Sequence, residues 1–480
     1  MGEYGVYPDS VHSGDGCACF IARNERDKVL IAVNGGDAFD GQDLMVNGRQ
    51  VRICPLNLQN SRIIRRLFPF TNPVANRKYA LSMGLGDRLG LASPGHIRLV
   101  KGKNIFPVLA QQSVRELTLT GRTFEDVLAS AVWAVFQEGY RDGYGADGDH
   151  LKTAGEVKGA LGDGYTMITL DCSEHIHNEY ESAQAESVQS RYDELDTQER
   201  RYWEDKYNNK AFDLCQGKHI HISDNMLKKT VLMYRDVLRF VETIYRDVIK
   251  PAGRDIDFEI SIDETSSPTS PEIHYMIASE IRDRGVSFMS LAPRFCGEFQ
   301  KGIDYRGDID QFTRELAYHA AIAEHFGYKI SVHSGSDKFS VFPAIGELTG
   351  RKLHIKTAGT NWLEALGVIA TADRGLFMDI CRFALDRLDD AKKYYHISTE
   401  KSMAPGTGDI AKDPLHYVRH DEAVRQVLHV TYGYILCETD ADGRYVFRDR
   451  FYRTLDENEQ AYYDALHRHI GRHLTGLGIN

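Results

Sequence analysis

Short apolar runs that resemble β-strands recur along this chain, and several end in acidic, basic or imidazole side chains. The clearest are Gly145–Lys152, Tyr165–His175, Phe258–Thr265, Lys329–Lys338 and Leu353–Thr357. Each is rich in β-formers, then polar, and then continues into a helix-like stretch. Alternating strands and helices with polar groups at the carboxyl end of each strand are typical of a (β/α)8 barrel enzyme. The sequence therefore predicts an α/β fold, a TIM-like (β/α)8 barrel with its active site at that end.

Eight strand candidates can be counted for this barrel, near residues 80, 145 and 167 and at Phe258–Glu264, Val286–Leu291, Lys329–His333, Leu353–Lys356 and Tyr395–Ser398. Apolar residues with helical spacing lie among them, at about 123–138, 224–249, 308–326, 361–372, 376–390 and 414–427. The first of these helices carries a capping signal in Thr123 and Asp126.

The chain is expected to have four parts. These are a small β-rich N-terminal region at 1–75, the catalytic barrel at 76–400, a polar helical insertion within it at about 177–250, and a helical C-terminal extension at 401–480. The N-terminal region has a strand at Val29–Val33 and hairpin signals at Asn34–Gly36 and Val46–Arg49. The insertion could be a solvated surface helix, a lid or an oligomer contact, so a homo-oligomer is left open.

Composition excludes several classes of protein. The formal net charge is −11, which disfavours nucleic acid or an anionic membrane as the main partner. The 8 cysteines are scattered and are expected to be reduced thiols. The sequence shows no long apolar span and no secretory leader pattern, so we expect a cytoplasmic protein.

Three histidines lie where strands should end, namely His150, His333 and His354. Imidazoles that converge on one face of a barrel suit a divalent cation such as zinc, manganese, nickel or cobalt, with an open position for water or substrate. We therefore predict these histidines as metal ligands. The carboxylates that could replace one of them are Asp171, Glu174 and Asp337.

Two carboxylates are candidates for proton transfer. Asp149 precedes His150, so it would lie beside metal-bound substrate oxygens, and Glu264 ends another strand. Cations at the same end of the barrel suggest a small anionic substrate, with a carboxylate favoured over a phosphate because no phosphate-binding loop is present. The predicted substrate-binding cations are Arg88, Lys152, Arg294 and Lys338. Lys356 could serve as a further cation or as a Schiff-base lysine.

Four motifs in this chain resemble the tagaturonate/fructuronate epimerases, which are metal-dependent enzymes of hexuronate catabolism. They are Met83–His96, Gly145–Lys152, Asp263–Thr265 and Val332–Lys338. Asp149-His150 and Val332-His333-Ser-Gly are also similar to short elements of class II metal-dependent aldolases.

The epimerase resemblance implies a retro-aldol route, because the two sugars differ at the carbon β to the ketone. A base would remove that carbon's hydroxyl proton, the adjacent C–C bond would break, and the aldehyde fragment would rotate before the bond reforms. The resemblance implies Asp149 and Glu264 as the acid/base pair and His150, His333 and His354 as metal ligands. Arg88, Lys152 or Lys338 would hold the uronate carboxylate, although Glu264 as ligand and His354 as substrate contact is an open alternative.

Other functions remain open on the sequence alone. A metal-dependent aldolase that releases its fragments, or another sugar-acid isomerase, would use the same residues. A non-catalytic sugar-acid binding protein has little use for so many acids and imidazoles. A glycosidase with two catalytic carboxylates would not need the histidines and would stay active after chelation.

Overall fold

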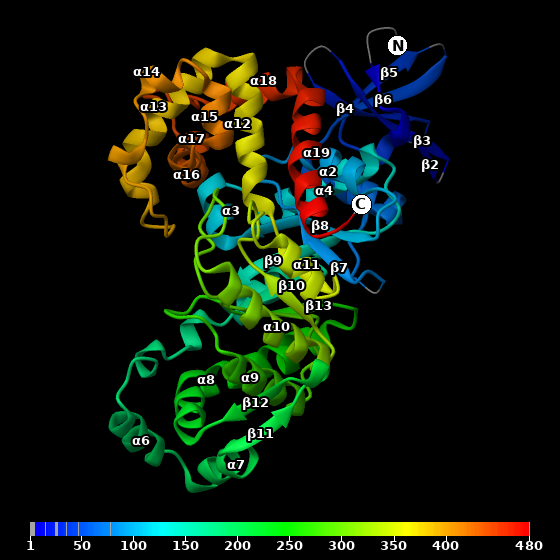
Figure 1. Cartoon of the computed structure of the whole chain (residues 1–480). Helices are drawn as coiled ribbons and strands as arrows, with labels where there is room; N and C mark the ends of the chain where they lie inside the picture. The colour runs from blue at the N-terminus through cyan, green and yellow to red at the C-terminus, as the bar shows by residue number, and fades with distance from the viewer. Residues whose placement is uncertain are drawn as a thin grey trace.

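The centre of the molecule is a closed barrel of eight parallel strands, in the spatial order β10-β13-β14-β15-β16-β7-β8-β9 (Figure 1). The computed structural model describes residues 5–14, 16–24, 27–34, 36–46, 48–76 and 78–479. The barrel strands are β7 (Leu81–Gly84), β8 (Ile105–Ser113), β9 (Gly145–Leu151), β10 (Met167–Asp171), β13 (Asp257–Ile262), β14 (Ser290–Pro293), β15 (Lys329–Val332) and β16 (Leu353–Lys356). The predicted (β/α)8 barrel is confirmed.

One of the predicted strands is wrong, and another element takes its place in the barrel. Residues 395–398 form no ladder; the Tyr395 hydroxyl bonds the Tyr432 hydroxyl at 3.0 Å, and the Ser398 N–H donates to Gln300 Oε1 at 2.9 Å. The eighth barrel strand is instead β8, which was not predicted from the sequence and which is buried along its whole length. It contains Pro107, and a proline inside an apolar run normally argues against a central strand.

Helices that follow the strands cover the outside of the barrel. They include α2 (Ser93–Val100), α4 (Phe124–Gln137), α5 (Ala154–Asp163), α9 (Pro271–Asp283), α10 (Ile309–Phe326) and α11 (Phe342–Leu348). The predicted capping box of α4 is confirmed, because the Thr123 side chain accepts from the Asp126 N–H and the Asp126 carboxylate accepts from the Thr123 N–H. Such a reciprocal pair satisfies two backbone donors at the helix start.

An antiparallel sheet of short strands forms the N-terminal region. Its strands are β1 (Gly5–Val6), β2 (His12–Gly14), β3 (Cys17–Arg23), β4 (Lys28–Val33), β5 (Gln42–Val46) and β6 (Arg49–Pro55). The predicted strand at Val29–Val33 is confirmed within β4, while Gly35 and Asn47 of the predicted turns lie outside the described residues. Cys19 and Leu30 belong to the same apolar core as the barrel, so this sheet packs onto the barrel.

The insertion between β10 and β13 projects from the barrel, in green in Figure 1. It consists of α6 (Ala185–Asp193), α7 (Thr197–Tyr207), a hairpin of β11 (Lys210–Asp213) and β12 (His219–Ile222), and α8 (Asp224–Ile244). Helix α8 runs into a π-helical turn at Tyr245–Ile249, so the helical path ends where the sequence predicts.

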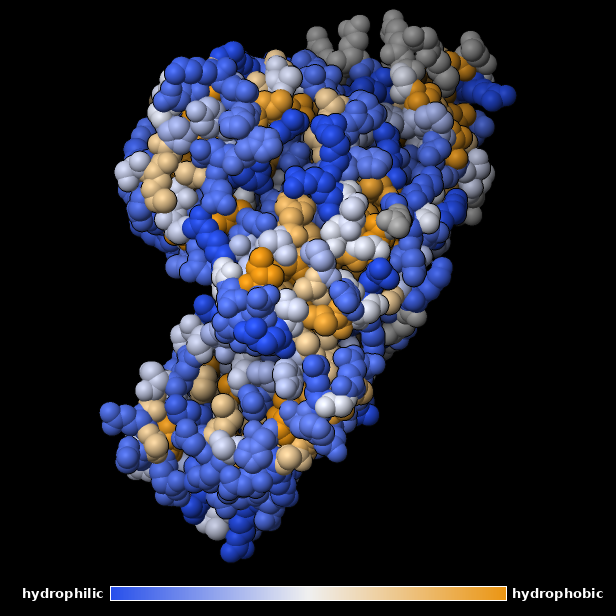
Figure 2. Space-filling view, in the orientation of Figure 1, coloured by the Kyte–Doolittle hydropathy of each residue, from blue (hydrophilic) through white to orange (hydrophobic). Residues whose placement is uncertain are grey.

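The helices after β16 form a layer with an apolar core of its own. They include α12 (Asn361–Ala372), α13 (Arg374–Ala391), α15 (Pro414–His420), α16 (Glu422–Val430), α17 (Tyr432–Cys437), α18 (Arg448–Glu457) and α19 (Glu459–Gly476). Figure 2 shows a mostly hydrophilic surface that is indented between this layer and the projecting insertion. Within the described residues, no helix has both the length and the apolar character required to cross a bilayer.

Substitution of Gly86, just after β7, tests how tightly the barrel is packed. A Cβ at this position would lie 1.9 Å from the carbonyl oxygen of Gln111, so Gly86→Ala forces the backbone apart. We expect a loss of about 1–3 kcal/mol or more in unfolding free energy, seen as a lower melting temperature. Gly159→Ala in α5 is the matched control, because its Cβ would meet nothing within 4 Å and alanine favours the helix. Equal melting temperatures for the two variants would contradict this packing.

Candidate active site and metal centre

The end of β9 presents Asp149 and His150 to a cavity. The pairing of β9 with β10 shifts register at this point, and His150 adopts a left-handed φ of 54°. A positive φ at a non-glycine residue costs energy and is concentrated at functional sites. Because the strand is irregular here, two consecutive side chains are both partly exposed and both line the cavity instead of alternating.

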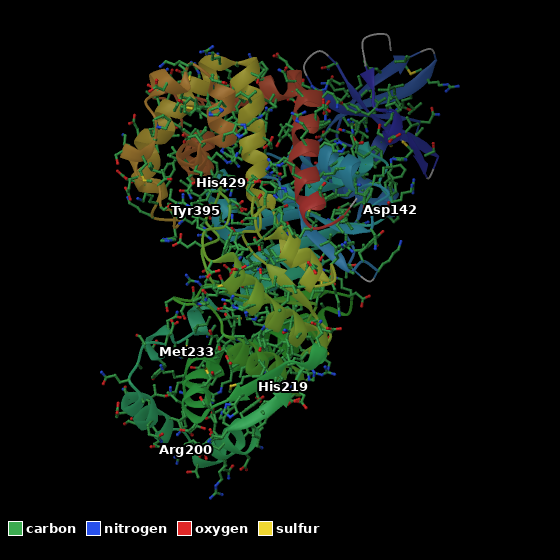
Figure 3. The ribbon with its side chains drawn as sticks, in the orientation of Figure 1. Asp142, Arg200, His219, Met233, Tyr395 and His429 are labelled. Atoms are coloured by element: carbon green, nitrogen blue, oxygen red, sulfur yellow. The ribbon has the colours of Figure 1, made fainter. Side chains whose placement is uncertain are left out.

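The cavity has a volume of about 400 Å³ and lies at the carboxyl ends of the barrel strands. Barrel loops supply most of its wall, and the segment at 394–396 together with His429 of α16 closes it from the C-terminal layer. Figure 3 shows Tyr395 and His429 next to each other on this side of the molecule. The lining residues include Arg88, Arg115, Glu116, Asp149, His150, Asp263, Glu264, Arg294, Lys301, His333, Lys356, Tyr395, His396 and His429.

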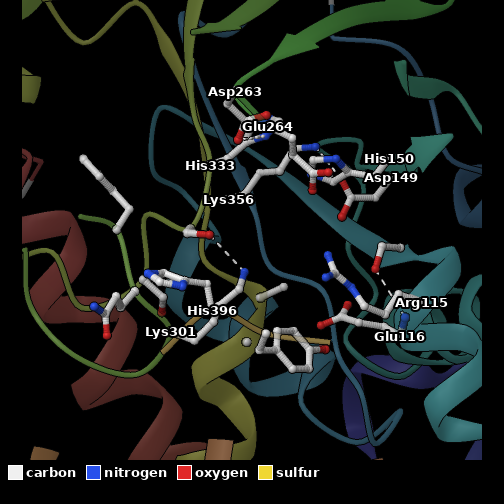
Figure 4. A pocket seen from close by; sticks show the side chains of 18 of the residues that line it. Arg115, Glu116, Asp149, His150, Asp263, Glu264, Lys301, His333, Lys356 and His396 are labelled. Carbon is white, nitrogen blue, oxygen red and sulfur yellow. Dashed lines mark hydrogen bonds and ion pairs between the residues drawn. The ribbon is translucent and has the colours of Figure 1, made fainter. Parts of the chain in front are cut away.

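An acid–imidazole group occupies one end of this cavity (Figure 4). His150, Asp171 and Glu264 each offer a ligand atom, and these atoms lie within 4.8 Å of one another. His150 Nδ1 is buried without a hydrogen bond and is 3.5 Å from Asp171 Oδ2. An imidazole nitrogen that makes no hydrogen bond and lies near two carboxylates belongs to a donor set that suits a divalent transition metal.

His333 joins this group at the end of β15. Its ring centroid is 4.9 Å from that of His150, and its two nitrogens contact Asp263 Oδ2 at 3.1 Å and Glu259 Oε1 at 2.8 Å. Burial would lower the pKa of His333, but these two carboxylates outweigh it and raise the pKa to about 9. A metal ion binds the neutral imidazole, so it would have to displace this proton.

Lys356 lies beneath the group, in the interior of the barrel. Its Nζ is 3.2 Å from Asp147 Oδ2 and 3.0 Å from Glu259 Oε1, and it also contacts Asp149. Burial would lower the pKa of Lys356, but the three carboxylates raise it well above its usual value. The amine therefore stays protonated, which argues against the Schiff-base alternative.

Asp149 is ionised in this environment. Burial would raise the pKa of its carboxyl, but the charges of Lys356 and His150 outweigh burial and bring the pKa down to about 2. Asp149 is 13% exposed and faces the cavity, so a ligand in the cavity can reach its carboxylate. The sequence prediction that Asp149 and His150 lie together at the site agrees with this geometry.

His354 does not reach the cavity. It lies fully buried inside the barrel, where its Nδ1 bonds Ser82 Oγ at 3.0 Å, and burial lowers its pKa to about 3. His354 and Lys356 are two residues apart on β16 and point to the same side of the strand, but His354 lies one layer deeper. The structure therefore separates His354 from the group with which it was predicted to bind metal.

Lys338 does not reach the cavity either, which corrects its prediction as a substrate-binding cation. Its side chain is fully buried, and Nζ donates to the backbone carbonyls of Gln300, Ile303 and Ser336 at 2.8, 2.6 and 2.9 Å. These bonds use all three donors of an ammonium group. Lys338 therefore ties together the loops that follow β14 and β15.

The other predicted cations differ in their surroundings. Arg88 and Arg294 line the cavity, but the Arg88 guanidinium is already paired with Glu116, with Nε 2.9 Å from Oε1. Lys152 lies outside the lining, with Nζ 3.7 Å from Asp171 Oδ2 and 3.6 Å from Glu174 Oε1. Glu174 is 65% exposed and pairs with Lys152, so it does not join the acid–imidazole group.

The lining residues that were not predicted from the sequence include Arg115, Lys301 and His429. Arg115 lies in the first turn of α3 (Val114–Thr120), which follows β8, the strand that the sequence did not reveal. Lys301 lies in the loop after β14, and His429 lies in the C-terminal layer. None of them ends a recognisable strand, so the signal that identified the other site residues does not apply to them.

A second acid–imidazole group lies outside the lining of this cavity, and we interpret it as structural. It contains Asp337, His469 and His473, all buried. His473 Nε2 accepts from the Asp337 N–H at 3.0 Å and its Nδ1 donates to the His469 carbonyl at 2.9 Å, so both nitrogens are used. Arg425 NH2 lies 2.5 Å from Asp337 Oδ2, and the positive charge of the guanidinium at this distance opposes the binding of a metal ion.

Comparisons with known proteins agree over nearly the whole chain. The sequence model of the tagaturonate epimerase family matches residues 7–477. A tagaturonate/fructuronate epimerase from Thermotoga maritima is 40% identical over 479 residues, which cover 99% of this chain and 97% of that protein. The native crystal structure of fructuronate-tagaturonate epimerase from Cohnella laeviribosi is 47% identical with a TM-score of 0.97, covering 100% of this chain and 97% of that one. A glycerol complex of the same enzyme gives the same values.

Lys338→Met tests the structural role of that lysine. The variant leaves buried carbonyl oxygens without a donor, so we expect it to lower the unfolding free energy by about 1–3 kcal/mol or more, which thermal melting would reveal. Lys352→Met, at an exposed lysine just before β16, is the control and should melt like the parent protein. An unchanged melting temperature for Lys338→Met, together with a raised KM, would instead support the predicted contact with substrate.

Proposed function

We propose that this chain, which belongs to the tagaturonate epimerase family, interconverts D-tagaturonate and D-fructuronate in a reaction that depends on a divalent metal. Family membership makes it an enzyme of the isomerase class, an epimerase. The observation that supports the finer proposal is the acid–imidazole group beside Asp149 at the carboxyl end of the barrel.

The metal would be held by His150 and Asp171, with the His333 ring beside them. His150 Nδ1 supports this assignment, because it makes no hydrogen bond and lies 3.5 Å from Asp171 Oδ2, so the two atoms could bind one cation. When bound, the ion would supply positive charge for an oxyanion that develops on the ketone side of the substrate. His354 is left out of the proposed ligand set because it lies deeper in the barrel.

Proton transfer would be carried by Asp149 and Glu264. The two sugars differ at the carbon β to the ketone, so a retro-aldol step must take the proton from the hydroxyl of that carbon and return it after the fragment has rotated. Asp149 is ionised and can accept this proton on one face of the substrate. Glu264 is the exposed carboxylate of the group and would protonate the oxygen on the other face.

Lys356 would position Asp149 at the wall of the cavity. Its ammonium contacts Asp149 from below and is held in turn by Asp147, Glu259 and the Thr169 hydroxyl, with Nζ 2.6 Å from Thr169 Oγ1. A carboxylate fixed in this way loses little freedom when the substrate binds, which is the advantage of a preorganised site.

Metal removal tests the proposal as a whole. We expect proton NMR of the protein with D-tagaturonate to show D-fructuronate, to show none after chelation and dialysis, and to show it again when a divalent metal is restored. Conversion that resists chelation would disprove metal dependence. Release of smaller fragments would instead indicate the aldolase, and absence of conversion with metal and intact fold would leave a sugar-acid binding protein.

Substitution of the two carboxylates tests their roles. Asp149→Asn and Glu264→Gln should each lower kcat by about 10²–10⁴-fold, because each removes one proton-transfer group. Divalent metal binding, measured by calorimetry, should persist in both variants. Asp142→Asn, at an exposed aspartate before β9, is the matched control and should keep its activity. A Glu264→Gln variant that loses metal affinity would show that Glu264 is a ligand.

A further inference from the structure

A cluster of cations faces the acid–imidazole group from the other end of the cavity. Arg88, Arg115 and Lys301 line this end together with Glu116, and Glu298, in the same loop as Lys301, also lines the cavity. Figure 4 shows Lys301, Arg115 and Glu116 apart from His150, His333 and Glu264 of the acid–imidazole group and from Asp149 beside them. Three cations against these two carboxylates leave a net positive charge, in a chain whose formal net charge is −11.

Arg88 is not available to a ligand. Its side chain is 2% exposed, and its guanidinium pairs with Glu116 through Nε and NH2 and stacks on the Tyr432 ring at 3.8 Å. This pair neutralises itself, so Lys301 and Arg115 carry the remaining positive charge. Neither has a carboxylate within ion-pair distance among the described residues.

Lys301 is the better placed of the two. Its Nζ donates to Ser334 Oγ at 3.0 Å, which leaves donors of the ammonium group unused. Burial lowers the pKa of Lys301; the Glu116 charge opposes this effect, and the charges of Arg115 and Arg88 add to it. A half-buried ammonium without an anion is less favourable than one paired with an anion, so an anion that enters the cavity gains from this contact.

Arg115 is held in place by the segment that closes the cavity. Its NH1 donates to the Tyr394 carbonyl at 2.7 Å, and the guanidinium lies 5.0 Å from the centre of the Tyr395 ring. A guanidinium has five N–H donors, so this contact leaves others free. The C-terminal layer therefore orients a cation that the barrel supplies.

We propose that Lys301 and Arg115 bind the carboxylate of the sugar acid and thereby make the site select hexuronates over neutral ketohexoses. This inference rests on the proposed function, and it replaces Arg88, Lys152 and Lys338 as the residues that hold the carboxylate. A hexuronate carries its carboxylate at the opposite end of the carbon chain from the ketone. With the ketone end at the acid–imidazole group, the carboxylate reaches the cationic end of the same cavity.

Lys301→Met tests this assignment, because methionine keeps most of the side-chain volume and removes the charge. D-tagaturonate is compared with D-tagatose, which has a hydroxymethyl group in place of the carboxylate, using kcat and KM for both. We expect kcat/KM for the uronate to fall about 10- to 100-fold, mainly through KM, as for loss of a charged hydrogen bond. The value for the neutral ketose should not fall. Arg115→Gln should act in the same direction, and Lys158→Met on the exposed face of α5 is the control.

The inhibition constant of D-tagatose against D-tagaturonate is measured on the same proteins, so the comparison does not depend on turnover of the neutral sugar. It should be unchanged in Lys301→Met while KM for the uronate rises. Equal losses for both sugars, or no loss for the uronate, would overturn the assignment. If Lys301→Met fails to fold, Arg115→Gln decides by the same criterion. A parent protein that does not convert D-tagaturonate would refute the proposed function itself, which is a different outcome.

Discussion

The interaction on which the site depends is the contact of the Lys356 ammonium with three carboxylates inside the barrel. Asp147 and Glu259 are fully buried, and neither could stay ionised there without a cation. Removing one partner of such a group leaves an uncompensated buried charge, which is far costlier than losing a surface ion pair. Lys356 and its carboxylate partners are therefore stable inside the barrel only when all of them are present.

The same contacts fix the residues at the mouth of the barrel. Glu259 is shared between Lys356 and His333, so the charge inside the barrel also sets the orientation of an imidazole in the cavity. Asp149 is held from below by the same ammonium. Because Lys356 and Glu259 are already bonded to each other and to these side chains, Asp149 and His333 are oriented before any ligand binds.

The C-terminal layer completes the site from above. Tyr395 and His429 line the cavity, Tyr394 and Tyr395 orient Arg115, and Arg425 contacts Asp337 in the loop after β15. Lys338 ties that loop to the one after β14. The extension is thus part of the wall of the cavity, although it has a separate apolar core.

The sequence by itself determined the barrel, the polar strand ends and the pairing of Asp149 with His150, because these follow from local patterns of alternation and from short motifs. It could not show that Pro107 lies within a barrel strand, or that residues 395–398 do not form one. Only the tertiary structure decided which cations face the cavity. Lys301 and Lys338 lie in consecutive loops, yet one lines the cavity and the other bonds three carbonyls. It also decided that His354 lies below the site while Lys356, two residues later, reaches Asp149. The reason is that the direction of a side chain in a loop, and its depth in a barrel, depend on partners that are distant in the chain.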